Sequence, residues 1–304
     1  MRAVDGARLA RTEERNPRST SIDRMSTIDL LRVINTEDQG VPTAVADVLP
    51  ALATAVDLAV EALSGGRRIH YVGAGTSGRI AVLDAAELIP TFGLEPGRVV
   101  AHIAGGTQAL TNPSEDAEDD EDAGVAVVDG VVAGDLVVGV TASGRTPYVR
   151  AALAVARAKG ACTVLVSANP ASPIAAAVDV HVAPDTGPEV LTGSTRMKAG
   201  TAQKLVLNAF STATMVRLGR TYSNLMTDML ASNDKLRDRQ LRILAEATGA
   251  DLDRCRQAFR VAGDAKVALV TLIAGTTAER ARQVLAEARG HVHVALRMLD
   301  GHGT

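Results

Sequence analysis

Aromatic residues are scarce in this chain. Phe, Tyr and Trp make up only 2% of its 304 residues, and Trp is missing altogether. The core must therefore be built from Ala, Val, Leu and Ile, which suits buried parallel strands and closely packed helices. So few rings also leave no platform on which nucleic-acid bases could stack. With a formal net charge of −3, the chain lacks the positive charge on which nucleic-acid binding relies.

Cysteine and long apolar runs are also rare. The two cysteines, Cys162 and Cys255, have neither metal-ligand nor redox-motif spacing, so we expect a reducing, cytoplasmic compartment. The six histidines show no metal spacing, so we expect no metal site. No run reaches the roughly 18 apolar residues needed to span a membrane. The arginine-rich N-terminus has no apolar segment of the kind found in secretory signals, and residues 1–14 are predicted to be a disordered extension.

Short apolar runs alternate with helical patterns through the first two thirds of the chain. Each run has about the 5–6 residues of a usual strand. The predicted strands cover residues 68–72, 99–104, 136–141, 163–167 and 178–182. This alternation predicts an α/β protein whose parallel sheet is covered by helices on both faces. In such sheets, ligands bind beyond the carboxyl ends of the strands.

The sequence pattern changes at about residue 236. Three short helical patterns follow, and Gly249, Gly263 and Gly275 lie at their boundaries. Glycine just after a helical pattern is a common stop signal. We therefore predict a main domain over residues 15–235, with an N-terminal helical arm, and a small helical C-terminal domain over residues 236–304.

A glycine- and hydroxyl-rich loop, Gly73-Ala74-Gly75-Thr76-Ser77-Gly78, follows the first predicted strand and begins a helix. Glycines let the backbone approach an anion, and a helix N-terminus offers free N–H groups. Dinucleotide-binding proteins share this glycine pattern, but they also need an acidic residue after the second strand. Here that strand ends in Ile103-Ala104-Gly105-Gly106. The hydroxyls of Thr76 and Ser77 favour a phosphomonoester, although a tight turn with a helix cap would give the same pattern.

Other predicted strand ends carry hydroxyl groups as well. The third strand ends in Thr141-Ala142-Ser143-Gly144-Arg145-Thr146, and the fourth ends in Ser167-Ala168-Asn169-Pro170. A further hydroxyl-rich segment, residues 192–201, precedes a long helical pattern. Each could be no more than a helix N-cap. Together, on one edge of one sheet, they predict a phosphate-sized polar cradle.

Two groups of carboxylates lie near these loops. Asp84 and Glu87 are three residues apart on the helix after the glycine loop, so they share a face among apolar neighbours. Desolvation there would favour the neutral acid, which suits a general acid, although an ion-paired or solvated glutamate fits equally well. Seven of the eight residues 115–122 are acidic. Such a run is usually a solvated helix start, yet it follows a strand and can supply one functional carboxylate.

Longer motifs, in order, resemble the signature of the N-acetylmuramic acid 6-phosphate etherases. The resemblance extends from about residue 12 to about residue 300. The matching motifs are residues 15–17, 21–27, 34–38, 73–79, 142–148 and 193–204. The resemblance implies a doubly wound α/β sandwich of the SIS (sugar isomerase) type, which binds phosphosugars, and a homodimer. It also implies cleavage of the D-lactyl ether of N-acetylmuramic acid 6-phosphate, giving N-acetylglucosamine 6-phosphate and D-lactate in cell-wall sugar recycling.

This reaction needs a base and an acid but no metal or redox cofactor. In the open-chain sugar the C2 proton is acidic, and the lactyl oxygen on C3 can leave by elimination before water adds. The resemblance assigns Glu87 as proton donor to the leaving lactate and Glu118 as the base at C2. Two carboxylates suit these roles provided that their environments separate their pKa values. The predicted phosphate- and substrate-binding residues are Gly75, Thr76, Ser77, Ser143, Arg145, Thr146, Ser194 and Lys204.

Some positions depart from the family pattern, and other functions fit the same fold. Ala86, Ile89 and Asp116 stand where the family often has Ser, Pro and Gly. A phosphosugar isomerase also needs a base beside a carbonyl but expels no lactate. A sugar-phosphate-sensing regulator, like the related glucokinase regulatory protein, would bind without turnover. The presence of both Glu87 and Glu118 favours the etherase, and an NAD-binding protein fits least well.

Overall fold

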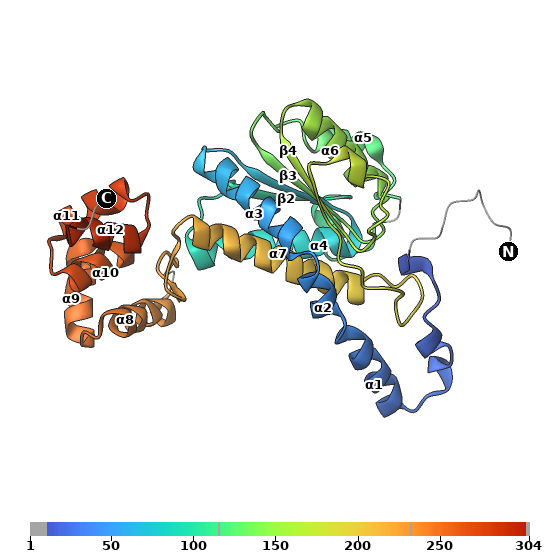
Figure 1. Ribbon diagram of the computed structural model, residues 1–304, viewed down its shortest axis with the longest axis horizontal. Coiled ribbons are helices and arrows are strands. Elements are labelled where there is room, and N and C mark those ends of the chain that lie inside the picture. The colour runs from blue at the N-terminus through green and yellow to red at the C-terminus, as the bar shows by residue number, and fades with distance from the viewer. Residues whose placement is uncertain (1–10, 115, 232, 302–304) are drawn as a thin grey trace. The chain divides into compact units, whose positions relative to one another are not determined.

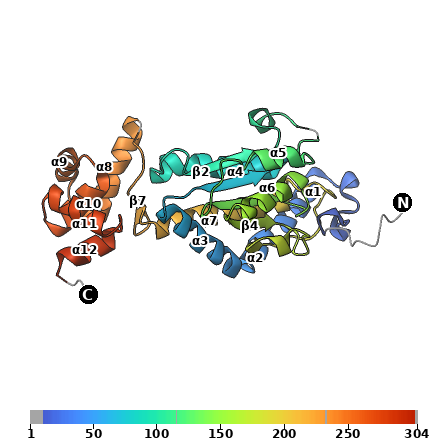
Figure 2. The same cartoon turned by 90° about the horizontal axis from the view of Figure 1, so that it is seen from above.

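The computed structural model describes residues 11–114, 116–231 and 233–301, and Figures 1 and 2 show its ribbon from two sides. The chain forms two compact units: residues 1–85 with 97–211, and residues 86–96 with 212–304. Residues 1–10 of the predicted extension lie outside the described residues. The next three, Arg11–Glu13, form a short 3₁₀ helix, η1.

The first unit is built on a five-stranded parallel sheet, as the sequence predicts. Its strand order is β2-β1-β3-β4-β5. The strands are β1 (Ile69–Gly73), β2 (Val99–Ile103), β3 (Leu136–Thr141), β4 (Cys162–Ser167) and β5 (Val180–Val182). The register sets Gly73 beside both Ile103 and Val140, and Thr141 beside Ser167. The carboxyl ends of these strands therefore meet along one edge.

Helices cover both faces of this sheet, which makes it a doubly wound sandwich. In Figure 1, α5 (Glu121–Ala126) and α6 (Pro147–Ala158) lie on one face, and α3 (Leu49–Ser64) and α7 (Lys198–Arg217) lie on the other. The alternation along β1 follows these layers. Val72 packs in a core cluster with residues of α6, whereas the Tyr71 ring contacts the Phe210 ring of α7.

An N-terminal arm precedes the sheet. It consists of η1, two more 3₁₀ helices, η2 (Pro17–Ser19) and η3 (Ile22–Arg24), and the α-helices α1 (Thr27–Asp38) and α2 (Val41–Ala46). Ser26 caps α1 by accepting a hydrogen bond from the Asp29 N–H, which is the usual role of serine before a helix.

No described helix is by itself long and apolar enough to cross a membrane. The helices Thr27–Ala46 and Leu49–Ser64 reach that length and apolar character only when they are taken together, and they are bent by 60° relative to each other.

The second unit is mostly helical. It contains the helices α8 (Asp234–Thr248), α9 (Leu252–Ala262), α10 (Ala265–Ala274), α11 (Ala278–Glu287) and α12 (Val292–Leu299), and a hairpin of β6 (Thr221–Tyr222) and β7 (Leu225–Met226). Gly249, Gly263 and Gly275 end α8, α9 and α10 in the left-handed conformation, a conformation that glycine adopts at little cost.

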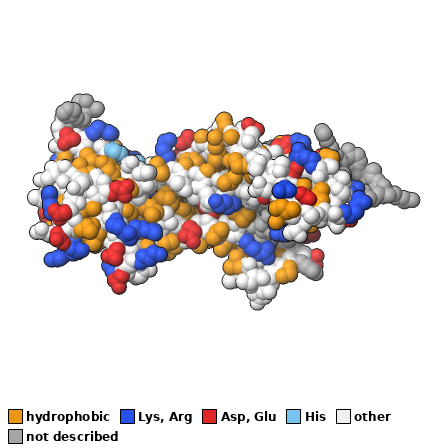
Figure 3. Space-filling view, turned by 90° about the horizontal axis from the view of Figure 1, so that it is seen from below, with side chains coloured by type: hydrophobic (Ala, Val, Ile, Leu, Met, Phe, Trp, Pro, Cys, Tyr) orange, Lys and Arg blue, Asp and Glu red, His pale blue; other side chains and the backbone are white. Residues whose placement is uncertain are grey.

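Two helices contribute to both units. The helix α4 (Gly75–Phe92) and the helix α7 each begin in the first unit and end in the second. Apolar and charged side chains of both signs are interspersed on the face shown in Figure 3. This mixed surface agrees with the small net charge of the chain.

Candidate functional site

A polar cavity of about 330 Å³ lies beyond the carboxyl ends of β1 and β3. Three hydroxyl-bearing loops and two carboxylates line it. The lining residues include Gly75, Thr76 and Ser77 after β1, Thr141, Ser143 and Thr146 after β3, Gly193 and Thr195 before α7, and Glu13 and Glu118. The hydroxyl-rich loops thus come together at the predicted edge of the sheet, from segments up to more than a hundred residues apart.

The glycine loop places the first turn of α4 against this cavity. Gly75 has a φ of +53° at the point where the helix begins. At Gly78, a methyl group would lie 2.8 Å from the Gly73 carbonyl oxygen and 2.6 Å from the Ile103 side chain, so only glycine fits there without displacement. The first N–H groups of a helix have no partner within the helix. They therefore remain available to an anion in the cavity.

The Ser77 hydroxyl is hydrogen-bonded within the protein. Its side chain is buried, and its Oγ donates a 2.9 Å hydrogen bond to the Gln203 side-chain oxygen on α7. A hydroxyl has one proton to donate, so this bond leaves Ser77 only its lone pairs and its backbone N–H. Gln203 was not singled out from the sequence, because a glutamine inside a helical pattern carries no signal of its own.

The loop after β3 is held by the loop after β4. The Asn169 side-chain amide donates to the Ser143 carbonyl oxygen at 2.8 Å, and the Ser172 hydroxyl donates to the Gly144 carbonyl oxygen at 2.6 Å. The hydroxyls of Thr141 and Thr146 lie 2.8 Å apart and share one hydrogen bond. Because one proton joins them, the second remains free for a ligand. The loop after β4 therefore supports the cradle, and the cavity lining comes from the loop after β3.

Three predicted binding residues lie apart from the cavity lining. Arg145 and Lys204 are exposed, and Ser194 is half-buried between Gly193 and Thr195, which do line the cavity. The loop before α7 was thus located by its hydroxyl pattern, but the lining side chain is Thr195. Among the described residues, no cluster of three or more His, Cys, Asp or Glu side chains is arranged to hold a metal ion.

Glu118 lies in an irregular acidic segment just before α5. Its carbonyl oxygen accepts a 3.0 Å hydrogen bond from the Tyr148 N–H in the first turn of α6, and Asp116, two residues earlier, has a φ of +63°. Glu118 also lines a second cavity, of about 310 Å³, which shares Gly75 and Thr76 with the first. Of the acidic residues 116–122, Glu118 thus borders both cavities and Asp116 borders the second.

The environments of Asp84 and Glu87 differ from the expectation. Asp84 is the buried carboxylate: it accepts hydrogen bonds from the Tyr71 hydroxyl at 3.0 Å and from Asn208 and Ser211 at 2.9 Å each. Burial raises the pKa of Asp84, although these three hydrogen bonds act in the opposite direction. Glu87 is exposed on α4 and belongs to the second unit. The prediction that Glu87 is desolvated among apolar neighbours is therefore wrong for the single chain, because the buried stripe of α4 runs through Ala81, Asp84 and Leu88, and Glu87 lies outside it.

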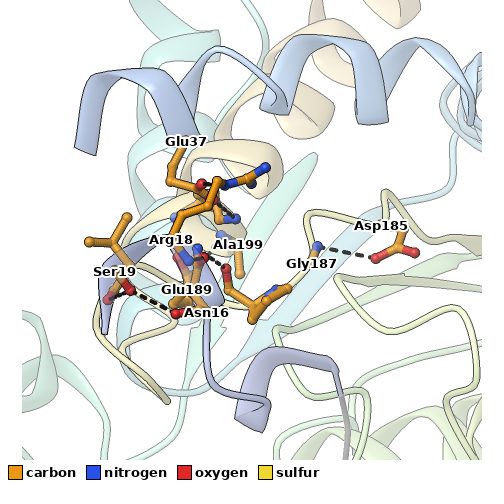
Figure 4. Close-up of polar contacts among 11 residues, drawn as sticks. Asn16, Arg18, Ser19, Glu37, Asp185, Gly187, Glu189 and Ala199 are labelled. Carbon is orange, nitrogen blue, oxygen red and sulfur yellow. Dashed lines mark hydrogen bonds and ion pairs between the residues drawn. The ribbon is translucent and has the colours of Figure 1, made fainter. Parts of the chain in front are cut away.

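The N-terminal arm is fixed beside the cavity by an ionic network around the buried Glu37 carboxylate, and Figure 4 draws its contacts. Glu37 forms ion pairs with Arg18 and, at 2.8 Å, with Lys198. Burial alone would raise the pKa of Glu37, but hydrogen bonds from Arg18, Lys198 and Asn16 and the charge of Lys198 lower it to about 2. Glu189 caps α7 by accepting from the N–H groups of Lys198 and Ala199, at 2.9 and 3.0 Å. The arm and the start of α7 are thus joined through charged groups.

Known domains and solved structures match the first unit. The SIS domain matches residues 108–213, and the glucokinase regulatory protein N-terminal SIS domain matches residues 51–157. A phosphoheptose isomerase from Francisella tularensis aligns with a TM-score of 0.51 and 16% identity, over 63% of this chain and 100% of that chain. Another phosphoheptose isomerase, from Neisseria gonorrhoeae, gives 0.50 and 20%, over 62% and 99%. Fold and site together define a SIS-domain protein with a hydroxyl-lined cavity at the carboxyl edge of its sheet.

Curated relatives are similar over most of the chain. An N-acetylmuramic acid 6-phosphate etherase from Thermobifida fusca is 59% identical over 265 residues, which is 87% of each chain. One from Pectobacterium atrosepticum is 51% identical over 288 residues, covering 94% of this chain and 95% of the relative. The chain belongs to the family of N-acetylmuramic acid 6-phosphate etherases.

Proposed function

We propose that this protein is a carbon–oxygen lyase that cleaves the D-lactyl ether of N-acetylmuramic acid 6-phosphate. The products are N-acetylglucosamine 6-phosphate and D-lactate, and the step belongs to the catabolism of cell-wall amino sugars. The observation that carries the proposal is the placement of Glu118 beside a hydroxyl-lined cavity at the N-terminus of α4, in a chain of this family.

The cradle suits the phosphate group of this substrate. Backbone N–H groups at the start of α4 and the hydroxyls of Ser143, Thr146 and Thr195 are hydrogen-bond donors, and the positive end of the helix dipole favours an anion. We infer that the phosphate binds there. The sugar would then extend toward Glu118, which lies at the boundary of the two cavities.

The proposed chemistry uses two carboxylates, of which Glu118 lines the cavity and Glu87 lines neither cavity of the single chain. Glu118 takes the proton from C2 of the open-chain sugar, and the electron pair forms a C2–C3 double bond as the C3–oxygen bond breaks. Glu87 donates a proton to the leaving lactate oxygen. Water then adds at C3, and C2 is reprotonated. Every step is a proton transfer, an elimination or an addition of water, so the reaction needs no metal or redox cofactor.

A homodimer is part of the proposal, and the surface of α4 supports it. The exposed residues Leu83, Ala86, Glu87 and Pro90 follow one another at helical spacing, so they form one stripe of the helix. Leu83 is 56% exposed, although it is a large apolar side chain. A second copy of the chain packed on this stripe would bury Leu83 and give Glu87 an apolar surrounding.

We also propose a cytoplasmic location, which is consistent with two free cysteines.

The proposal is tested by incubating the purified protein with N-acetylmuramic acid 6-phosphate, without added metal or cofactor, and measuring D-lactate. We expect lactate and N-acetylglucosamine 6-phosphate in equal amounts. If no lactate forms even with enzyme in excess over substrate, the proposed function is wrong. Binding without turnover would then indicate a sensor, and an aldose–ketose conversion without lactate would indicate an isomerase.

A further inference from the structure

Glu13 is a carboxylate that lines the cradle and that none of the sequence motifs includes. It lies in η1 of the N-terminal arm and borders the same cavity as Thr76, Glu118 and Ser143. Its Oε2 atom is 3.4 Å from the position that a methyl group on Gly193 would occupy. The carboxylate therefore lies against the loop that precedes α7, on the cavity side of the arm.

The position of Glu13 is set by contacts on either side of it. Thr12 is fully buried, and its hydroxyl lies 3.5 Å from Glu13 Oε1. Beyond it, the Asn16 side chain donates to the Pro188 carbonyl oxygen at 3.3 Å, and the Ser19 hydroxyl donates to the Val190 carbonyl oxygen at 2.7 Å. Figure 4 shows Asn16 and Ser19 beside the loop before α7, which carries Glu189. Glu13 thus belongs to an anchored stretch of chain.

The chemistry of a carboxylate limits what Glu13 can bind. An ionised carboxylate only accepts hydrogen bonds, and Thr12 alone donates one to it among the residues that the structure describes. The phosphate group of a sugar phosphate is mostly doubly ionised at neutral pH, so it offers mainly acceptors and carries the same sign of charge as a carboxylate. Glu13 is therefore a poor ligand for the phosphate group, although it borders a cavity whose other polar groups suit phosphate. Its complement is a neutral donor, such as a sugar hydroxyl or an amide N–H.

We propose that Glu13 is a substrate-binding residue that orients the phosphosugar in the cradle. It accepts a hydrogen bond from a hydroxyl or amide N–H of the sugar, and its charge keeps the phosphate at the side lined by hydroxyls and by the start of α4. This inference rests on the proposed function, since it deepens the description of the same site. Glu118 keeps the role of base, and Glu13 determines the direction in which the phosphosugar lies in the cavity.

The hydrogen bond that Glu13 accepts and the charge that it carries are separated by measuring two constants on the same variants. These are the KM for lactate release and the inhibition constant of inorganic phosphate. In Glu13→Ala, the KM for lactate release should rise about 10- to 100-fold, the scale of a lost hydrogen bond to a charged group, with a much smaller change in kcat. The inhibition constant of inorganic phosphate should stay equal or fall, because a repelling charge is removed. Glu13→Gln keeps an acceptor oxygen, so its KM should rise less while phosphate inhibition changes as in Glu13→Ala.

The matched control is Glu14→Gln. Glu14 is the next carboxylate of the arm and does not line the cavity, so both constants should stay at the wild-type values. A KM within two-fold of wild type in Glu13→Ala would overturn the inference. So would a parallel loss of affinity for substrate and for phosphate, which indicates a disordered arm. If phosphate fails to compete in the wild type, the cradle is misassigned and the inference falls with it.

Failure of the proposed function gives a different pattern. If the wild type releases no lactate, the etherase proposal is wrong, and the inference is tested by calorimetry with N-acetylglucosamine 6-phosphate and inorganic phosphate as the two probes. Weaker sugar phosphate binding with unchanged or tighter phosphate binding in Glu13→Ala would still support the role of Glu13. Equal binding of both probes in wild type and variant would overturn it.

Discussion

The ammonium group of Lys198 lies 2.8 Å from the carboxylate of Glu37, and both side chains are at most 4% exposed. Glu37 lies on α1 of the arm, and Lys198 is the first residue of α7. The segment between Pro188 and Lys198 carries Gly193 and Thr195, which line the cavity. The buried pair therefore holds together two parts of the chain that meet at the cradle.

Glu37→Leu should lower the free energy of unfolding by about 3–5 kcal/mol, because it leaves the Lys198 ammonium buried without its counter-charge. Chemical denaturation measures this. The double variant Glu37→Leu/Lys198→Met should recover much of the loss, since a buried pair can often be replaced by apolar groups. The exposed pair of Arg32 and Asp29 provides the control: Arg32→Met should cost less than about 1 kcal/mol. If Glu37→Leu and Arg32→Met lowered the free energy of unfolding equally, the stabilising role of the buried pair would be contradicted.

Glu37 should also make stability depend on pH in the acidic range. Its folded pKa is about 2, below its ordinary value of 4.5. The contribution is therefore fully present above pH 4.5 and is lost as the pH falls toward 2, where the unfolded chain binds the extra proton. Between these values, wild type should lose up to about 1.4 kcal/mol per pH unit more than Glu37→Gln. Unfolding curves from pH 5 to pH 2 test this, and parallel pH profiles would refute it.

Glu118→Gln and Glu87→Gln should each lower kcat by about 10²-fold or more, the scale of a lost general acid or base. Lactate release under saturating substrate is the measurement. Asp119→Asn is the control for Glu118, because Asp119 belongs to the same acidic run and does not line either cavity. Near-normal turnover in both glutamate variants would remove them from the mechanism and leave Glu118 a surface carboxylate.

Gly78→Ala should destabilise the protein by about 1–3 kcal/mol, the usual cost of forcing extra atoms into a packed site. The added methyl group would meet Ile103 and the Gly73 carbonyl oxygen at less than 3 Å. It should also weaken substrate binding, since the start of α4 must shift. Gly130 has no neighbour within 4 Å of an added methyl group. Gly130→Ala should therefore stay within about 0.5 kcal/mol of wild type, and a similar loss in both variants would contradict the steric account.

The strands and the cradle loops were predictable because each leaves a local signal. The strand predicted over residues 68–72 corresponds to β1, Ile69–Gly73. The hydroxyl-rich loops follow the strands directly. Parallel topology then brings their ends to one edge. The sheet and most of the cavity lining therefore follow from strand patterns and turn chemistry.

The orientation of α4 and the position of Glu13 could not be predicted from the sequence, because both depend on contacts between distant segments. Asp84 and Glu87 share a helix whose buried stripe runs through Ala81, Asp84 and Leu88, and Leu83, a large apolar residue, points to solvent. Hydropathy alone would orient this helix differently, because two of the three polar partners of Asp84, Asn208 and Ser211, come from α7, more than a hundred residues away. Glu13 has no local pattern either, since its place is set by the seating of the arm on the segment before α7.

The shared helix α4 has a consequence for dissecting the protein. Residues 86–96 belong to the second unit but lie within the sequence of the first, so no single cut separates the two. A chain that stops after Ser211 would divide α7 and would leave Leu88 and Phe92, both buried in the full chain, without the unit to which they belong. The Pro90 and Gly93 carbonyl groups would also lose their donors, the Leu230 N–H and the Arg220 guanidinium. Such a truncation should aggregate, and the C-terminal helices should be treated as part of the enzyme's folding unit.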